Sequence, residues 1–141
     1  MDLKDLENEL NNCSQCYLRK DCKSPVGWFG NPESPIVFVG EGPGSVEDDY
    51  GCPLIGPSGQ LLDKALWAAK MTRDRVLTTN VIKCRPKNNR TPDIAEADFC
   101  AKLWLDRELE IIKPKVVVAL GGVAMHYLPC CRNISDSSAS R

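Results

Sequence analysis

Ile36-Val37-Phe38-Val39-Gly40-Glu41-Gly42-Pro43-Gly44 is a short apolar run that passes at once into a glycine-rich turn. Three of its first four residues are β-branched, which favours a strand. An apolar run bounded in this way is typical of a buried parallel strand whose carboxyl end opens into a functional loop. The stretch therefore predicts a strand over residues 36–39 and a binding loop over residues 40–44.

Two more runs of the same character follow along the chain, at residues 76–82 and 115–120. The segments between these runs carry apolar residues at helical spacing. One helix is predicted over residues 58–71, with Ser58 as its cap, because its leucines and alanines share one face. Another is predicted over residues 91–113, because proline stands in its first turn and another proline follows its end.

Shorter helices are predicted at residues 3–12 and 121–128, whereas residues 16–34 are rich in proline, glycine and polar residues and are predicted to be a loop. Strands that alternate with helices indicate an α/β fold of three layers, with a parallel sheet and helices on both faces. Ligands bind such sheets at the carboxyl ends of the strands. The loops that fall there span residues 40–44, 80–90 and 121–122.

Composition and length favour one globular domain. The chain has 141 residues, of which 43% are hydrophobic and 26% are charged, and this size suits a single core over residues 1–128. Residues 129–141 lack core periodicity and are predicted to be an irregular or disordered tail. No apolar run approaches the ~20 residues of a membrane span. The acidic start lacks the features of a secretory signal, so we expect a cytoplasmic monomer.

The eight cysteines are many for a reducing compartment, where such a surplus indicates metal binding or redox chemistry. Four of them could converge on one tetrathiolate site, because a Cys-x-x-Cys pair is followed by a cysteine at a strand end and another in the next helix. These are Cys13, Cys16, Cys84 and Cys100.

Thiolates suit either zinc or an iron–sulfur cluster, although zinc ribbons usually carry two close Cys-x-x-Cys pairs. The alternative is that Cys84 and Cys100 are small buried apolar residues without a ligand. Cys22 is close enough in sequence to compete with Cys16. The remaining cysteines are unassigned, and they are Cys52, Cys130 and Cys131.

The net charge of −1 gives no general footprint for nucleic acid, so any such footprint must be local. One candidate is the basic loop, which we define as residues 83–90. Its cations suit phosphate contacts, although a charged loop is often plain solvent-facing surface. The four cations are Lys83, Arg85, Lys87 and Arg90.

Several blocks of the sequence follow the order of one known family. They are Gly40-Glu41-Gly42-Pro43-Gly44, Glu47-Asp48, Gly51-Cys52-Pro53-Leu54-Ile55-Gly56, Gly59-Gln60-Leu61-Leu62, Asn80-Val81-Ile82-Lys83-Cys84-Arg85-Pro86 and Pro114-Lys115-Val116-Val117-Val118-Ala119-Leu120-Gly121. From about Leu10 to about Leu128, the chain resembles the family 4 uracil-DNA glycosylases. The resemblance implies base excision repair of uracil-containing DNA and favours a [4Fe–4S] cluster over zinc on the four cysteines.

The resemblance also implies roles for individual residues. The loop residues Gly40, Glu41 and Gly42 would line a uracil pocket, with Glu41 as the catalytic carboxylate that activates water or stabilises the sugar. Asn89, together with Glu47, would support the catalytic site. These roles require a base that has been turned out of the stack.

Asn80 and Leu54 would contact the uracil itself. The amide of Asn80 presents both a donor and an acceptor, which would select uracil over cytosine. Leu54 stands where the family has phenylalanine as a stacking floor. Because stacking on an aromatic ring contributes about 1–3 kcal/mol per base, leucine should weaken binding while keeping the pocket apolar.

The sequence departs from the family at its end, where the last strand region, a His-Pro-Ser type motif and a DNA-inserting loop are missing. We therefore expect a C-terminally truncated relative. The hypotheses are an active glycosylase, a weakly active or inactive iron–sulfur DNA-binding relative, and a zinc-stabilised protein without a DNA function. His126 is predicted to be an ordinary helix residue, and Trp67 and Trp104 to be core residues.

Overall fold

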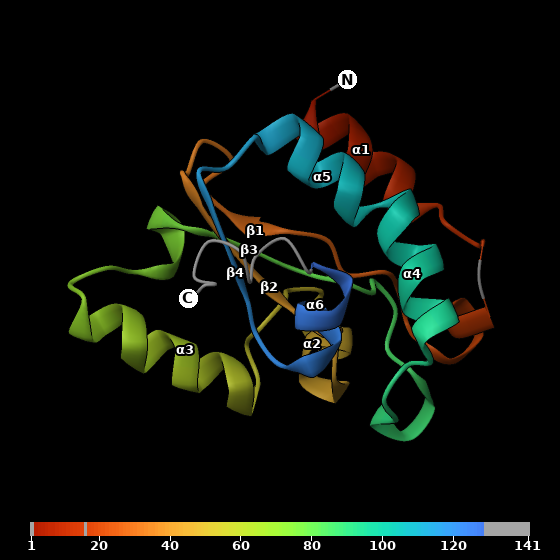
Figure 1. Cartoon of the computed structure of the whole chain (residues 1–141). Coiled ribbons are helices and arrows are strands. Elements are labelled where there is room, and N and C mark those ends of the chain that lie inside the picture. The colour runs from red at the N-terminus through yellow and green to blue at the C-terminus, as the bar shows by residue number, and fades with distance from the viewer. Residues whose placement is uncertain (1, 16, 129–141) are drawn as a thin grey trace.

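The computed structural model of the protein describes residues 2–15 and 17–128, which form six helices and four strands (Figure 1). The strands are β1 (Phe29–Gly30), β2 (Ile36–Gly40), β3 (Leu77–Asn80) and β4 (Val116–Ala119). The helices are α1 (Leu3–Asn11), α2 (Ser45–Tyr50), α3 (Pro57–Ala68), α4 (Ile94–Leu103), α5 (Leu105–Ile112) and α6 (Gly122–Tyr127). Short 3₁₀ turns lie at Tyr17–Asp21, Arg73–Arg75 and Lys87–Asn89.

The four strands form one sheet in the order β1-β3-β2-β4. The three predicted strands are confirmed, and β2 pairs in parallel with both β3 and β4. The prediction of an all-parallel sheet is wrong at one edge, where β1 pairs antiparallel with β3. β1 lies inside the segment predicted to be a loop. Two residues are too few to show an alternation of apolar and polar side chains, so the sequence carries no signal for this strand.

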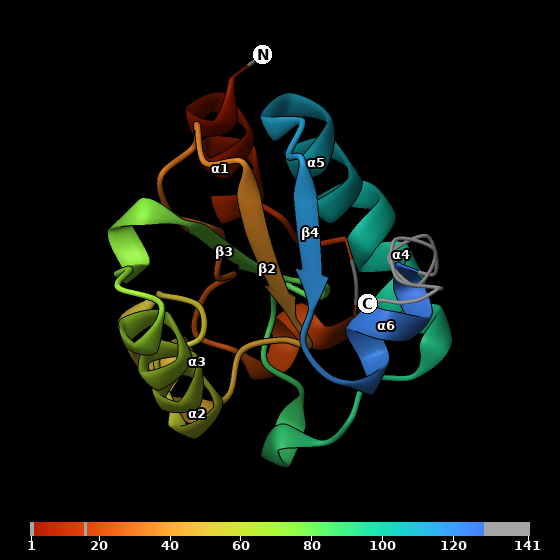
Figure 2. The same cartoon turned by 60° about the vertical axis from the view of Figure 1, so that its left-hand side comes forward.

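Helices cover both faces of the sheet, as the alternating pattern predicts (Figures 1 and 2). Val37 and Val39 of β2 pack in a core with α1, α4 and α5, whereas Phe38 between them packs in a second core with α3. Side chains along a strand point alternately to opposite faces, so β2 contributes residues to both cores. The molecule is therefore the expected three-layer α/β domain.

Three local predictions about the helices are wrong. The helix predicted over residues 91–113 is two helices, because Trp104 has a non-helical φ of −124° between α4 and α5. The N-cap of α3 is Gly56 rather than Ser58, with proline at the first helical position. Trp104 is in the core as predicted, but Trp67 is 76% exposed on α3.

No helix within the described ranges is both long and apolar enough to cross a membrane.

Candidate active site

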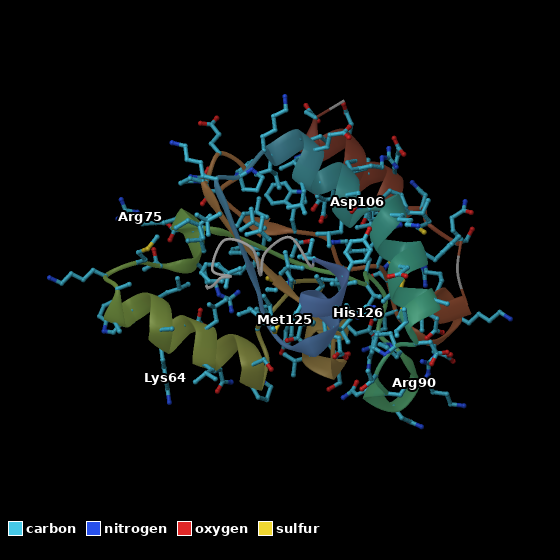
Figure 3. All side chains as sticks on the ribbon, in the orientation of Figure 1. Lys64, Arg75, Arg90, Asp106, Met125 and His126 are labelled. Carbon is cyan, nitrogen blue, oxygen red and sulfur yellow. The ribbon has the colours of Figure 1, made fainter. Side chains whose placement is uncertain are left out.

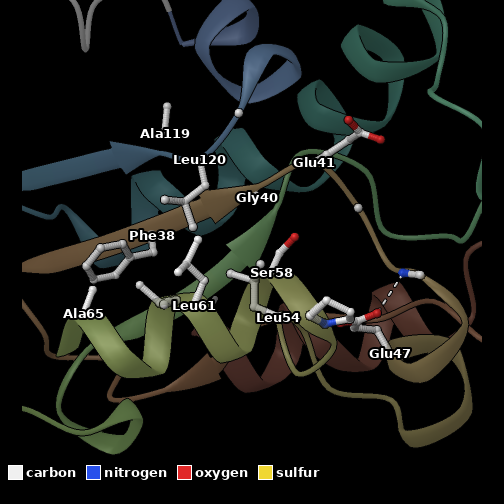
Figure 4. A pocket seen from close by; sticks show the side chains of 15 residues that line it. Phe38, Gly40, Glu41, Glu47, Leu54, Ser58, Leu61, Ala65, Ala119 and Leu120 are labelled. Carbon is white, nitrogen blue, oxygen red and sulfur yellow. Dashed lines mark hydrogen bonds between the residues drawn. The ribbon is translucent and has the colours of Figure 1, made fainter. Parts of the chain in front are cut away.

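The carboxyl ends of the parallel strands open into a cavity of about 820 Å³ (Figure 4). This volume is in the range of small-molecule sites. Its walls come from the ends of β2 and β4, the loop after β2, and the first turns of α3. Gly40, Glu41, Gly42 and Leu54 all line the cavity. The structure thus brings Leu54 together with the consecutive loop residues 40–42, at the edge where the strand pattern predicts a site.

Glu47 holds the two loops of the cavity together. Its carboxylate is buried and accepts hydrogen bonds from the backbone N–H groups of Gly44 (2.9 Å), Ile55 (3.0 Å) and Gly56 (2.6 Å). The bond to Gly44 is drawn in Figure 4. A carboxylate that accepts several backbone bonds is a strong structural link. Glu47 therefore links the loop after β2 to the start of α3, and its supporting role in catalysis stays a prediction.

Arg73 clamps the turn that carries Leu54. Its guanidinium donates to the carbonyl oxygens of Pro53 (3.4 Å), Leu54 and Gly59 (3.2 Å), and its Nε lies 2.8 Å from Asp63 Oδ1. Leu54 itself has a left-handed φ of 56°, which is uncommon for a residue with a side chain. Sequence reasoning missed Arg73, because its acceptors are backbone carbonyls 14 to 20 residues away.

Gly59 allows the same turn to approach α3. A Cβ on this residue would lie 1.7 Å from the Leu54 carbonyl oxygen, a distance that no side chain tolerates. The close approach seats Leu54 in the cavity wall while 92% of its surface is covered. Leu54 thus supplies the apolar surface expected of a stacking floor, although without an aromatic ring.

Asn80 lies at the end of β3 and is only 1% exposed. Both polar atoms of its side chain, Oδ1 and Nδ2, are buried without a hydrogen-bond partner among the described residues. Asn80 Oδ1 is 2.6 Å, and Leu54 Cδ2 is 3.0 Å, from the point where a Cβ on Gly40 would lie. The amide therefore adjoins the cavity wall at Gly40. A buried unpaired amide costs about 1–3 kcal/mol, so it calls for a functional explanation.

Glu41 contributes the carboxylate at the rim of the cavity. In Figure 4 its side chain points away from Leu54, on the other side of the Gly40 backbone. Glu41 is exposed, yet partial burial of its carboxyl raises the pKa of that group above the ordinary value. A raised pKa keeps a carboxylate more basic. The position and the pKa suit a group that exchanges protons with a ligand in the cavity.

The structure corrects the expectation that Lys83 contacts DNA phosphates. The Lys83 side chain is 1% exposed, and its ammonium lies 2.7 Å from the carboxylate of Glu108 on α5. The Glu108 side chain is 2% exposed. The sequence did not predict this burial, because a lysine among other cations is typical of an exposed loop. The partner that buries it stands 25 residues away, and no local pattern links Glu108 to the loop.

The other three cations of the basic loop and Asn89 lie on or near the surface, away from the cavity lining. Arg85 is half-buried and its Nε donates to Asn89 Oδ1 at 2.6 Å. Arg90, labelled in Figure 3, makes two 2.8 Å bonds to Glu96 and thereby lowers the pKa of that carboxyl. Lys87 is exposed. The predicted roles of these residues in DNA contact and of Asn89 in catalysis stay predictions.

Three of the four predicted cluster ligands pack in one core. Cys84 and Cys100 are buried there, and Cys13 is half-buried against the same residues, whereas Cys16 lies outside the described residues. The backbone N–H of Lys83 donates to Cys100 Sγ at 3.3 Å. Such N–H···S bonds are typical of the surroundings of iron–sulfur clusters. Among residues 2–15 and 17–128, no three potential ligands are grouped as a formed metal site.

Cys22, which sequence reasoning left unassigned, also belongs to this region. A hydrogen bond from the side chain of Cys84 to the Cys22 sulfur, opposed by burial and aided by Arg19, lowers the pKa of Cys22 to about 7. The guanidinium of Arg19 lies 3.7 Å from Cys22 Sγ. Soft thiol donors therefore gather beside the end of β3, and their chemistry fits a thiolate-bound cofactor.

Comparison with known proteins identifies the family. A sequence model of the uracil DNA glycosylase superfamily matches residues 28–137. The chain is 42% identical to a type-4 uracil-DNA glycosylase of Pyrobaculum aerophilum over 91% of this chain and 65% of that relative. Identity is again 42% to the type-4 enzyme of Archaeoglobus fulgidus, over 89% and 63% of the two chains. Identity to the type-4 enzyme of Thermotoga maritima is 39%, over 92% of this chain and 67% of that relative.

The chain thus spans about two thirds of the length of these relatives, and the matched part includes every wall of the cavity. The family model alone covers well over half of the chain. Since family, fold and the site at the strand ends agree, this chain belongs to the uracil DNA glycosylase superfamily, among the type-4 uracil-DNA glycosylases.

Proposed function

We propose that this chain acts as a uracil-DNA glycosylase, which hydrolyses the bond between uracil and deoxyribose in DNA. The observation that carries the proposal is the side chain of Asn80, whose amide is buried and unpartnered beside the cavity. In the free protein this amide only destabilises the fold. A ligand that offers one donor and one acceptor side by side would complete its hydrogen bonds.

Uracil has that pattern along its Watson–Crick edge. Its N3–H would donate to Asn80 Oδ1, and its O4 would accept from Asn80 Nδ2. Cytosine reverses both groups, so its edge would not match the amide in this orientation. A site built around buried hydrogen bonds rejects a ligand that lacks them more strongly than an apolar pocket does. Leu54 and Gly40 would pack against the faces and margin of the base, with Gly42 in the adjoining wall.

Glu41 would serve the sugar side of the reaction. As the glycosidic bond breaks, positive charge develops at C1′ and the electron pair leaves with uracil. A carboxylate at the rim, turned away from the base floor at Leu54, is suited to accept a proton from the attacking water and to stabilise the positive sugar. Water then adds its hydroxyl to C1′ while the uracil anion departs.

The proposal is tested by incubating the protein with single- and double-stranded DNA that contains one uracil. Alkali-labile sites at uracil, and none at a cytosine in the same position, are the expected result. Release of neither base by protein that is folded and carries its cofactor would overturn it. Binding without release would instead favour the DNA-binding relative considered from the sequence.

Glu41→Gln is expected to lower kcat/KM by about 10²-fold, the low end for a general base, because Glu41 is exposed. The wild-type rate should fall as pH falls, since protonation removes the reactive carboxylate. This fall should begin above the ordinary glutamate pKa of about 4.3, because burial raises the pKa of Glu41. A pH–rate profile of both proteins checks this, and an unchanged acidic limb in Glu41→Gln would contradict it.

The partner would be uracil-containing DNA, held by the exposed side of the basic loop. Lys87 is exposed, and Arg85 and Arg90 are partly so, which suits phosphate contacts that position the strand without reading its sequence. Asn89, bonded to Arg85, would support this loop and the catalytic site from outside the cavity lining.

A [4Fe–4S] cluster would be held by Cys13, Cys16, Cys84 and Cys100. The common core of the three described cysteines and the N–H···S bond to Cys100 support a thiolate-bound group here, and the similarity to the type-4 family favours a cluster over zinc. The cluster would supply a rigid thiolate-bound anchor rather than reaction chemistry. Since Cys84 lies four residues after Asn80, the cysteines would hold the end of β3 and the basic loop in fixed relation to α4.

Cys84→Ser and Cys100→Ser are each expected to abolish a broad absorbance near about 400 nm in anaerobically purified protein. Cys52→Ser is the matched control, because Cys52 is half-buried in the loop after α2, apart from this core. Cys22→Ser tests whether the thiol beside Cys84 is needed for assembly. Stoichiometric zinc in colourless wild-type protein would contradict the cluster.

A further inference from the structure

The buried lysine after β3 takes part in a closed set of polar contacts. Lys83 Nζ donates to Thr79 Oγ1 (2.6 Å), to the Asn80 carbonyl oxygen (2.8 Å) and to Glu108 Oε1 (2.7 Å). Thr79 Oγ1 in turn donates to the same Glu108 oxygen at 2.7 Å. All three ammonium protons therefore have acceptors, and Thr79, Lys83 and Glu108 are each at most 2% exposed.

A buried ion pair of this kind is a poor source of stability. Removing two charges from water costs about as much as their attraction returns, so apolar residues of similar volume often serve the fold equally well. What such a pair adds is a defined geometry, because its hydrogen bonds are directional. The question is therefore which group the pair orients.

The group it orients is Asn80. The side-chain amide of Asn80 has no hydrogen bond of its own to hold it, so its direction depends on the backbone that carries it. On one side that backbone is paired with Gly40 of β2. Its carbonyl oxygen accepts from Lys83, and Lys83 is fixed by Glu108 from across the core. A shift of this peptide would swing the amide directly.

We propose that Lys83 and Glu108 are positioning residues for the uracil-reading amide of Asn80, and that Lys83 has no contact with DNA. Lys83 acts through the Asn80 carbonyl and touches neither base nor phosphate. The inference rests on the proposed function, in which Asn80 reads the base. It separates Lys83 from Lys87, Arg85 and Arg90, which the sequence alone grouped with it.

The test is the double variant Lys83→Met/Glu108→Leu, which removes the polar contacts without leaving a buried charge unpaired. We expect it to fold and to keep the absorbance of the wild type. Its kcat/KM for uracil-containing DNA should fall about tenfold, mostly through KM, because a displaced amide weakens base binding before and during the reaction alike. Lys102→Met, an exposed lysine of α4, is the control and should match the wild type. An unchanged KM in the double variant would overturn the proposal.

The salt dependence of DNA affinity distinguishes positioning from phosphate contact. Losing a phosphate contact makes the decrease of log K with log salt less steep, by about one unit of slope. The slope should be unchanged in the double variant, and a reduced slope would assign Lys83 to DNA and overturn the inference. Lys87→Met should reduce the slope and shows that the measurement detects such a contact.

Crystal structures of the wild type and the double variant keep this inference apart from the proposed function. If the wild type releases no uracil, the proposed function fails, and the position of Asn80 still decides the inference. A displaced Asn80 amide in an otherwise superposable variant supports positioning, whereas an unmoved amide overturns it. Should the double variant not fold, Thr79→Val takes its place with Thr79→Ser as control, because only valine removes the hydroxyl that Lys83 and Glu108 share.

Discussion

Replacing Asn80 by leucine is expected to make the protein more stable and nearly inactive. Leucine has the same number of side-chain heavy atoms in the same branched arrangement but no polar atoms, so the substitution removes a buried amide that has no partner among the described residues. The free energy of unfolding should rise by about 1–2 kcal/mol, because an unsatisfied buried polar group is lost. Uracil excision should fall by about 10³ in kcat/KM, because the groups that pair with the base and stabilise the departing anion are gone.

The measurements are urea unfolding under anaerobic conditions and single-turnover uracil release. Thr78→Val is the matched control on the same strand, since Thr78 is equally buried but its hydroxyl donates to the Phe29 carbonyl at 3.3 Å. This control should lose stability and keep activity, the opposite of Asn80→Leu. A destabilised Asn80→Leu with normal activity would show that the amide serves the fold and would remove the main support for the proposed function.

Glu108→Leu alone is expected to lower the free energy of unfolding by about 3–5 kcal/mol. The substitution leaves the Lys83 ammonium buried at 1% exposure without its carboxylate, and such an unpaired charge is among the costliest defects in a core. Most of this loss should return in the double variant with Lys83→Met. The two substitutions would thus be strongly non-additive, as expected for residues that contact each other.

Denaturant midpoints of the two single variants and the double variant check this cycle. Asp49→Leu makes the same chemical change in the exposed ion pair with Lys23. It should leave the midpoint nearly unchanged, because solvent screens such pairs. Additive effects of Lys83→Met and Glu108→Leu would contradict the direct coupling seen in the structure.

Much of the candidate site was predictable because its residues lie at the ends of apolar runs. Gly40 ends β2, Glu41 and Gly42 follow it directly, and Asn80 ends β3. Parallel strands bring their carboxyl ends to one edge of a sheet, so these positions converge whatever the loops do. Leu54 was found through the family resemblance alone, since its left-handed φ and its place in the cavity wall depend on Arg73 and Gly59.

The sequence by itself determined the α/β class, the three parallel strands and the edge where the cavity opens, because strand and helix periodicities are local and survive in any packing. Only the tertiary structure decided that Lys83 is buried and Trp67 is exposed, which reverses what each residue type predicts. Burial depends on partners remote in the chain. The carboxylate of Glu108 makes a buried lysine tolerable, and the sequence around Lys83 contains no trace of it.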